Sequence, residues 1–411
     1  MRRVAITGLG AVSALGIGVP ALWDGLIAGR SGVGLITRFD TTHYLARVAA
    51  EVPGFAFESY FDSTELELLD PFAQFAIVAA REATAQAGLE LADHERDRAG
   101  ITFGSGMGGV TTQDDRYKRF YADLPTTRVH PFSIPRMMNN AAASQLSMRF
   151  GLRGPALAMA TACAASSHAI GEAAEMIRAG RADVMLAGGA DAPIAPGVVR
   201  CWEAMRVLAP VPKDGNASRA CRPFSRDRLG MVLAEGAAVV VLESWERATG
   251  RGAAILAELA GYGATADAAH ITQPGIDAPA RAIAIALEQA RLDPAEIDYV
   301  NAHGTGTRLN DPTETAIVKR AFGERAKSLA ISATKAAHGH AMGASAALEL
   351  IATVLAIRNG VVPPTINYTE PDPECDLDYV PNQARQMPVR AAISNSFAFG
   401  GLNAVLAVKK V

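Results

Sequence analysis

Four short segments, far apart in the chain, hold residue types that could act together on a thioester. Cys163 lies among alanines, and His303 lies in a turn rich in glycine and threonine. Lys335 comes five residues before His340, and residues 395–401 form a glycine-rich segment that can supply backbone N–H groups. A thiol nucleophile, two imidazoles and a set of N–H donors suit the formation of carbon–carbon bonds from thioesters.

Cys163 is the candidate nucleophile. It follows an apolar segment, 156–160, and precedes a segment with helical spacing, 164–179, which ends at a glycine. At a helix start, the free N–H groups and the positive end of the helix dipole lower the pKa of a thiol. Most free cysteines are buried and inert, so the position alone leaves that alternative open. The other cysteines lack this setting and are expected to be inert: Cys201, Cys221 and Cys375.

His303 follows a predicted strand, 297–300, and strand ends are where ligands collect in α/β sheets. Thr305 and Thr307 put two hydroxyls on the same turn, which suits hydrogen bonds to the amides of an extended ligand arm. A lone histidine is more often a hydrogen-bonded core residue, and the residues alone leave that alternative open.

His340 opens a predicted helix, 344–358. A helix N-terminus favours the neutral imidazole, which can donate to an oxyanion or accept a proton. Glu349 on that helix could pair with Lys335, and such a pair could be purely structural. We treat His338 as a neighbour rather than a catalyst. The spacing of His338 and His340 matches no zinc signature, so no metal site is expected.

Two glycine-rich segments could bind a ligand through their backbone. Phe399-Gly400-Gly401 follows a predicted strand, and its N–H groups could complete an oxyanion hole with the N–H of Cys163. A tight turn before the last strand is the simpler alternative. Residues 8–13 match a dinucleotide-binding fingerprint only in part, because the third glycine is absent.

The composition of the 411 residues excludes several classes of protein. Apolar residues make up 49% and charged residues 20%, which excludes wholesale disorder. Lys+Arg 39 against Asp+Glu 42 gives no excess of positive charge for binding nucleic acid. Four cysteines without a CxxC spacing favour a reduced, cytoplasmic protein over a disulfide scaffold. Glycine and proline interrupt the uncharged stretch 4–23, so we expect neither a signal peptide nor a membrane segment.

Strand-like and helix-like segments alternate along the chain, which predicts an α/β protein with largely buried sheets. No low-complexity linker interrupts it. We therefore expect two similar halves packed face to face, 1–250 with the cysteine and 251–411 with the histidines. The expected strands are 4–7, 99–103, 182–187, 237–242, 254–259, 297–300, 391–394 and 404–408. The expected helices are 21–28, 70–87, 164–179, 279–290 and 344–358.

Taken in order, the four segments resemble those of a known family. The set ATAC (160–163), NAHGTGT (301–307), TKxxxGHxxGA (334–344) and NSFxFGG (395–401) resembles the elongating β-ketoacyl-acyl-carrier-protein synthases, which are thiolase-like condensing enzymes. The resemblance implies an αβαβα fold of five layers with two duplicated halves. It implies a homodimer, or a heterodimer with a related chain-length-factor subunit. It also implies an acyl carrier protein as partner, with phosphopantetheine arriving on that carrier and no other cofactor.

The resemblance implies a role for each matching residue. Cys163 would take the acyl chain from the carrier protein. A malonyl group on a second carrier would lose CO₂, with His303 and His340 stabilising the enolate, and the carbanion would attack the acyl thioester. Lys335 would shape the electrostatics of the site, with Glu349 as its partner.

Other matching residues would bind the two substrates. Thr305 and Thr307 would hold the pantetheine arm, and the N–H groups of Cys163 and Phe399 would form the oxyanion hole. The acyl pocket or its gate would be lined by Met107, Trp202 and Phe399.

Rival functions stay open at this point. A thiolase or another non-decarboxylating acyltransferase would use the same cysteine, but a thiolase needs a second cysteine as base near the C-terminus, and residues 397–401 hold none. A partner subunit that keeps its active-site residues, or a ketosynthase active only beside a chain-length factor, is the other alternative. Ala398 and Leu402 stand where the family usually has glycine and threonine, and residues 308–314 look like those of specialised-metabolite ketosynthases. We therefore expect a substrate outside ordinary saturated fatty acids, such as a polyene or polyketide chain.

Overall fold

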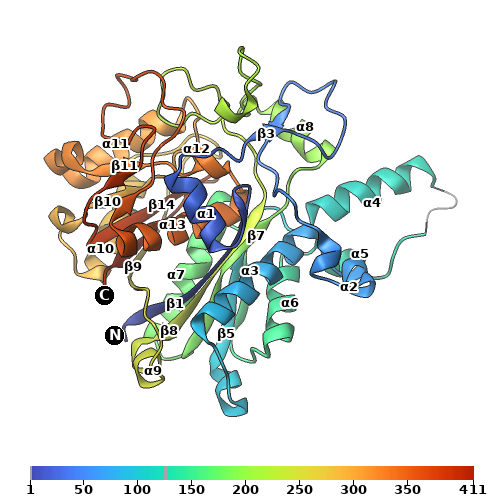
Figure 1. Ribbon diagram of the computed structural model, residues 1–411, viewed down its shortest axis with the longest axis horizontal. Helices are drawn as coiled ribbons and strands as arrows, with labels where there is room; N and C mark the ends of the chain where they lie inside the picture. Colours follow the sequence, from blue (N-terminus) through green and yellow to red (C-terminus); the bar gives the residue numbers. More distant parts are fainter. Residues whose placement is uncertain (1, 125–127) are drawn as a thin grey trace.

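The computed structural model describes residues 2–124 and 128–411. Within this part of the chain, the main sheet contains two sets of five strands, and β2 (Gly16–Ile17) pairs with β1 outside the row (Figure 1). The first set is β1 (Val4–Ser13), β5 (Ala99–Gly104), β6 (Ala156–Met159), β7 (Val184–Asp191) and β8 (Gly236–Ser244). The second set is β9 (Ala257–Ala266), β10 (Tyr299–Asn301), β11 (Ala330–Ser332), β14 (Ala391–Ala398) and β15 (Leu402–Lys409).

The two sets repeat one topology. The first set runs β6-β5-β7-β8-β1 and the second runs β11-β10-β14-β15-β9, so the third, second, fourth, fifth and first strands of each set are neighbours. In both sets, the first three strands of that order are parallel to one another. The fourth strand is antiparallel to the third, and the fifth is antiparallel to the fourth. The sets meet where β1 pairs with β9, at Ala5 with Glu258 and Ile6 with Ala257. The chain is therefore an internal duplication, whose predicted limits at 1–250 and 251–411 stay a prediction.

Helices cover the sheets in three layers. The helix α3 packs on β1 and β8, and α10 packs in the same way on β9 and β15. Between the two sets, α7 packs on β7 and β5, α13 packs on β14, and these two helices contact one another. The order helix, sheet, helices, sheet, helix gives five layers, so the predicted αβαβα fold is confirmed. These helices are α3 (Pro71–Ala87), α7 (Ala165–Arg178), α10 (Asp277–Ala290) and α13 (Ser345–Asn359).

Glycines inside strands allow this close packing. A Cβ at Gly8 would lie 2.1 Å from the carbonyl oxygen of Ala83, and one at Gly10 would lie 1.9 Å from that of Ala79. The expected end of the first strand at residue 7 is therefore wrong, because β1 continues through both glycines beneath α3. For the same reason β7 continues through Gly188, where a Cβ would lie 2.0 Å from the carbonyl oxygen of a residue in β8.

Some of the remaining helices were predicted from the sequence, and others were not. The predicted helix 70–87 is confirmed as α3, with Asp70 as a side-chain N-cap and Gly88 in the left-handed conformation at its end. The helix α4, which extends away from the body of the molecule (Figure 1), was not expected, because its sequence has no apolar core face. The other helices are α1 (Val19–Ile27), α2 (Ser63–Leu68), α4 (Val110–Ala122), α5 (Ser133–Met137), α6 (Ala141–Phe150), α8 (Pro196–Ala204), α9 (Trp245–Gly250), α11 (Asn310–Phe322) and α12 (Lys335–His338). The short strands are β3 (Gly34–Leu35), β4 (Val48–Ala49), β12 (Val361–Val362) and β13 (Arg385–Gln386).

One helical window in the described residues is long and apolar enough to cross a membrane. It covers Met342–Asn359, has a mean hydropathy of 1.2, and is 83% buried inside the fold. It includes α13, one of the two helices of the central layer, and burial of this kind is typical of a core helix.

Candidate active site

Cys163 lies in a sharp bend between β6 and α7. The bend is a 3₁₀ turn, η3 (Ala162–Ala164), and α7 begins at Ala165. Ala162 has a φ of 49°, a left-handed conformation that costs energy for a residue with a side chain. Such strain is characteristic of sites where a side chain must be held in one place. The Cys163 thiol is 6% exposed and points into the interior at the start of the helix.

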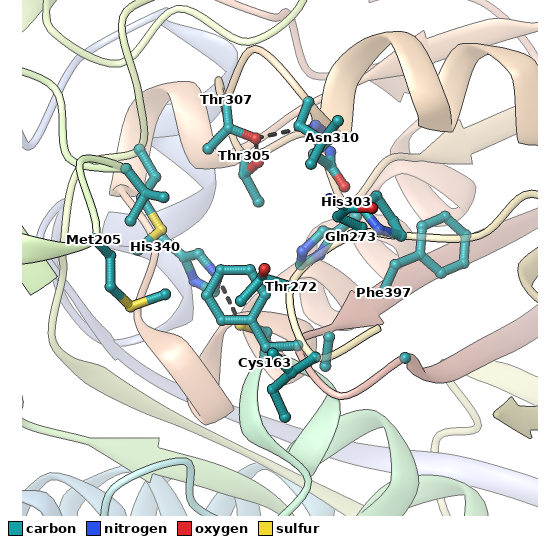
Figure 2. A pocket seen from close by; sticks show the side chains of 18 of the residues that line it. Cys163, Met205, Thr272, Gln273, His303, Thr305, Thr307, Asn310, His340 and Phe397 are labelled. Carbon is teal, nitrogen blue, oxygen red and sulfur yellow. Dashed lines mark hydrogen bonds between the residues drawn. The ribbon is translucent and has the colours of Figure 1, made fainter. Parts of the chain in front are cut away.

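The structure brings the cysteine and the two histidines together (Figure 2). His340 Nε2 lies 3.1 Å from Cys163 Sγ. The rings of His303 and His340 lie 5.7 Å apart at 87°, and one ligand atom of each of the three residues lies within 4.8 Å of the others. His338 stays outside this group, with its Nε2 3.1 Å from Thr334 Oγ1. Cys163 therefore shares one small volume with two histidines that lie at least 140 positions later in the chain.

Backbone contacts fix the position of His340. Its N–H donates to the carbonyl of Val232 at 2.7 Å, and its carbonyl accepts from the N–H of Ala234 at 2.9 Å. The preceding Gly339 has a φ of 70°, and a Cβ there would lie 2.8 Å from Ala50. The histidine is thus tied to the segment before β8 and cannot shift without moving it.

Hydrogen-bond donors set the tautomers of both histidines. The N–H of Met342 donates to His340 Nδ1 at 3.2 Å, so this nitrogen is an acceptor and the ring proton lies on Nε2. Lys335 Nζ lies 3.4 Å from His303 Nδ1, and an ammonium group can only donate, so the His303 proton also lies on Nε2. Both rings therefore present an N–H to the space beside Cys163.

Lys335 contacts His303 directly and affects the pKa of both rings through its charge. It is fully buried, donates to the carbonyl of His303 at 2.6 Å, and forms an ion pair with Glu349. Burial, with the Lys335 charge as second cause, lowers the pKa of His303 and His340 well below the ordinary value. Burial also raises the pKa of Glu349, while the lysine opposes that shift. Both imidazoles are consequently neutral at neutral pH.

The thiol differs from the sequence-based expectation. Burial raises the pKa of Cys163 to about 12, although the Lys335 charge acts in the opposite direction. The expected lowering of the thiol pKa by the helix start is therefore wrong, because burial of the thiol outweighs it. The resting group is a thiol, and its use as a nucleophile would require the negative charge on sulfur to be stabilised.

Two carboxylates that the sequence did not single out shape the turn after His303. Glu314 accepts from the N–H groups of His303 and Gly304, both at 2.7 Å, and Asp311 accepts from that of Gly306 at 3.2 Å. Both carboxylates are buried on α11, which begins seven residues after His303. Buried acids at a helix start beside a glycine turn could have signalled this role, because a buried carboxylate must find hydrogen-bond donors and the N–H groups of the turn are close to it in sequence.

A cavity of about 300 Å³ reaches Cys163 from outside. Thr305 and Thr307 line it with their Oγ1 atoms 3.0 Å apart, on the far side of the cavity from the thiol (Figure 2). His303 and His340 line its inner end. The hydroxyls thus lie along the path that a bound arm would follow to the sulfur.

A second cavity of about 730 Å³ continues beyond the cysteine. The rings of Trp202 and Phe399 stack with centroids 6.0 Å apart at 24°, and both line both cavities. The predicted pocket residue Met107 also lies here. One face of α4 forms the outer wall with helical spacing: Val110, Gln113, Asp114, Tyr117, Lys118 and Tyr121.

Phe399 lies in the hairpin turn between β14 and β15, where Ala398 pairs with Leu402. Two N–H groups of this turn are occupied: Gly400 donates to the carbonyl of Ile271 at 2.7 Å and Gly401 to that of Ala398 at 3.1 Å. Within the described residues this leaves the Phe399 N–H as the turn's candidate donor toward the cavity. The segment can therefore form a tight turn before the last strand and still offer one N–H donor to the cavity.

Two family models together match most of the chain. The family model for the N-terminal domain of β-ketoacyl synthases matches residues 1–248, and that for the C-terminal domain matches residues 256–369. The chain belongs to the β-ketoacyl synthase family. It is thus an enzyme of the acyltransferase class with the thiolase-like fold.

Relatives of this β-ketoacyl synthase align over almost their full length. Nodulation protein E of Rhizobium sp. (strain N33) is 47% identical over 410 residues, which is 100% of both chains. The 3-oxoacyl-[acyl-carrier-protein] synthase 2 of Staphylococcus aureus (strain N315) is 43% identical over 100% of this chain and 98% of its own. The solved structure of the ishigamide ketosynthase/chain length factor superimposes with a TM-score of 0.93 at 39% identity, covering 100% of this chain and 99% of that one.

Proposed function

We propose that this β-ketoacyl synthase joins an acyl chain on Cys163 to a malonyl group on an acyl carrier protein, with loss of CO₂. The product is a β-ketoacyl group on the carrier. The observation that carries the proposal is the position of Cys163 Sγ, 3.1 Å from His340 Nε2 and at the junction of two cavities. One cavity admits the carrier's arm, and the other holds the acyl chain.

Acyl transfer to the cysteine is the first half of the reaction. A phosphopantetheine arm enters the cavity lined by Thr305 and Thr307, and Cys163 Sγ attacks the thioester carbon. The N–H groups of Cys163 and Phe399 stabilise the oxyanion. The Nε2–H of His340 stabilises the developing thiolate, and the thiol proton leaves with the pantetheine sulfur. The C–S bond to pantetheine breaks as the one to Cys163 forms.

Decarboxylation and condensation form the second half. A malonyl thioester takes the same arm position, and the Nε2–H groups of His303 and His340 donate to its thioester oxygen as the enolate charge develops. The carboxyl group leaves as CO₂, and the carbanion attacks the acyl carbon on Cys163. The C–S bond to Cys163 then breaks, and the Cys163 thiolate takes up one proton from water to restore the thiol. Two neutral imidazoles are needed as donors, and the burial beside Lys335 keeps them neutral.

The placement of the other cysteines disfavours a thiolase reaction. Cys221 Sγ is buried and donates to the carbonyl of Lys335 at 3.2 Å, and Cys201 lines the acyl cavity away from the histidines. Cys375 packs with Tyr379 in the core of the second half. None of these described thiols can serve as a base beside His303.

We further propose a second, related subunit as partner, either an identical chain or a chain-length factor. The strand β6 ends the sheet, and its Leu157 is exposed. The helix α6 contacts β6, α5 contacts α6, and α4 contacts α5. These three helices also carry exposed apolar side chains: Tyr117, Tyr121, Ile134 and Met148. An open strand edge flanked by apolar side chains is a surface that a partner covers. The cytoplasmic location, and the lack of any cofactor besides carrier-borne phosphopantetheine, stay predictions.

The proposed acyl substrate is unsaturated or oxygenated rather than a simple saturated chain. The cavity that would hold it is walled by the rings of Trp202, Phe399, Tyr117 and Tyr121 and also carries polar groups of α4. Aromatic faces and polar groups favour conjugated or keto-bearing chains over flexible methylene chains.

An acyl-carrier panel tests reaction and substrate together. The purified enzyme is given malonyl carrier with saturated, polyunsaturated or β-keto acyl carriers of equal length, and CO₂ and β-ketoacyl product are measured. We expect kcat/KM about tenfold higher for the unsaturated or keto chains, a size of discrimination that pocket contacts provide. A strict preference for saturated chains would contradict the substrate proposal. Absence of condensation with every chain, while the acyl group still reaches the cysteine, would contradict the reaction.

A further inference from the structure

His340 has a side-chain neighbour that the proposed reaction does not yet use. Ser345 Oγ lies 2.9 Å from His340 Nδ1, on the side of the ring opposite Cys163. Ser345 is 1% exposed and is the first residue of α13. Within the part of the chain that the structure describes, His340 Nδ1 is the polar atom with which the Ser345 hydroxyl forms a hydrogen bond.

The direction of this hydrogen bond follows from the other contact of Nδ1. The Met342 N–H also points at Nδ1, at 3.2 Å, and a peptide N–H can only donate. Nδ1 is therefore unprotonated, and the Ser345 hydroxyl must donate to it. Two donors converge on one ring nitrogen, and the ring proton is left on Nε2, which faces Cys163.

We propose that Ser345 is a positioning residue that strengthens the Nε2–H of His340 as a donor to the substrate oxyanion. A donor at Nδ1 withdraws electron density from the ring, so the opposite N–H becomes more acidic and its hydrogen bond to a negative oxygen becomes stronger. The hydroxyl also fixes the plane of the ring. The proposal rests on the proposed function, because its consequence is measured in the malonyl half-reaction.

The turn that holds Ser345 is anchored independently of its hydroxyl. This turn is η7 (Met342–Ala344), and Met342 has a φ of 47°. The N–H of Gly343 donates to Asp191 at 2.7 Å, and that carboxylate also accepts from the Gly106 N–H at 2.8 Å. A Cβ at Gly343 would lie 2.5 Å from the Gly106 nitrogen, so the two segments are in close contact. Removing the hydroxyl should therefore leave the backbone in place.

Ser345→Ala in the full-length enzyme tests the proposal. We expect kcat for malonyl-carrier decarboxylation to fall about tenfold, the effect of losing one hydrogen bond made to a developing charge, with KM little changed. Ser345→Thr, which keeps a hydroxyl, should recover most of the rate. The matched control is Ser166→Ala: Ser166 is also buried and accepts from the Ala347 N–H of the same helix at 3.0 Å, but it touches neither histidine. Ser166→Ala should stay within about twofold of the unmodified enzyme.

The same substitution in a Cys163→Ala background separates two ways in which Ser345 could act. An unchanged tenfold ratio is expected, because the hydroxyl acts through Nε2 on the malonyl group. A ratio near one in that background would mean that Ser345 acts on the thiol, and would overturn the proposal. Equal losses in Ser345→Ala and Ser166→Ala would overturn it as well, because they would reflect general packing.

A readout without substrate keeps this proposal separate from the proposed function. Nitrogen-15 NMR of histidine-labelled enzyme, with His340→Asn to assign the signal, reports the hydrogen bonding of Nδ1. Ser345→Ala should move the Nδ1 resonance toward that of a nitrogen with fewer donors, and Ser166→Ala should not. If the enzyme decarboxylates no malonyl carrier, the proposed function fails. An unmoved Nδ1 resonance overturns the role of Ser345 whatever the reaction.

Discussion

Cys163→Ala is expected to reduce condensation by about 10⁴-fold or more, because the variant lacks the thiol that would hold the acyl chain. Malonyl decarboxylation should persist within about tenfold, since His303 and His340 keep their Nε2–H donors without the thiol. Condensation is followed as β-ketoacyl carrier, and decarboxylation as acetyl carrier and CO₂. The two activities should therefore separate in a single variant.

The matched control for that variant is Cys201→Ala. Cys201 is an exposed, free cysteine that lines the acyl cavity, but it lies away from the histidines. Its removal should leave condensation within about threefold, as expected for a surface position. Full condensation activity in Cys163→Ala would refute the covalent step, and equal losses in both variants would point to packing rather than chemistry.

Lys335→Met is expected to affect both stability and rate. It leaves the fully buried Glu349 without its cation, and breaking a buried ion pair in this way costs about 3–5 kcal/mol. Decarboxylation should also fall about 10²-fold, because His303 loses the donor at Nδ1 that fixes its tautomer. Urea unfolding measures the first effect and CO₂ release measures the second.

Adding Glu349→Gln to Lys335→Met separates the two roles of the pair. The double variant buries no lone charge, so most of the lost stability should return. The rate should stay low, because the donor at His303 is still absent. Recovery of both stability and rate in the double variant would show that the lysine is only structural, which is the alternative that the sequence left open.

The fold was predictable where local signals agree with tertiary packing. The helix α3 has an N-cap aspartate, an apolar face and a C-terminal glycine, and its bounds match the expectation. The strand β1 was cut short because Gly8 and Gly10 look like turn residues in isolation. Glycine is needed at these positions because Ala79 and Ala83 of α3 pack closely against the strand. This helix lies about 70 residues later in the chain, and a single sequence does not reveal the contact.

The site was predictable from residue types, and its energetics were not. The segments that hold the four residues stand out because glycine, alanine or threonine surrounds a reactive side chain. The fold brings these side chains together: Cys163, His303, His340 and Lys335. The thiol pKa was expected to be low, but burial of Cys163 depends on the whole fold and raises it. The supporting groups Glu314, Asp311 and Ser345 were missed, because they act through backbone or ring contacts that have no motif.

Chasing the acyl-enzyme with malonyl carrier shows whether the acyl chain that condenses is the one held on Cys163. The enzyme is first loaded with a labelled acyl group, which mass spectrometry should locate on Cys163, and malonyl carrier is then added. We expect the label to leave Cys163 at the rate of CO₂ release and to be recovered as β-ketoacyl carrier, one product for each CO₂. A label that stays on Cys163, or that is released without CO₂, would contradict this expectation.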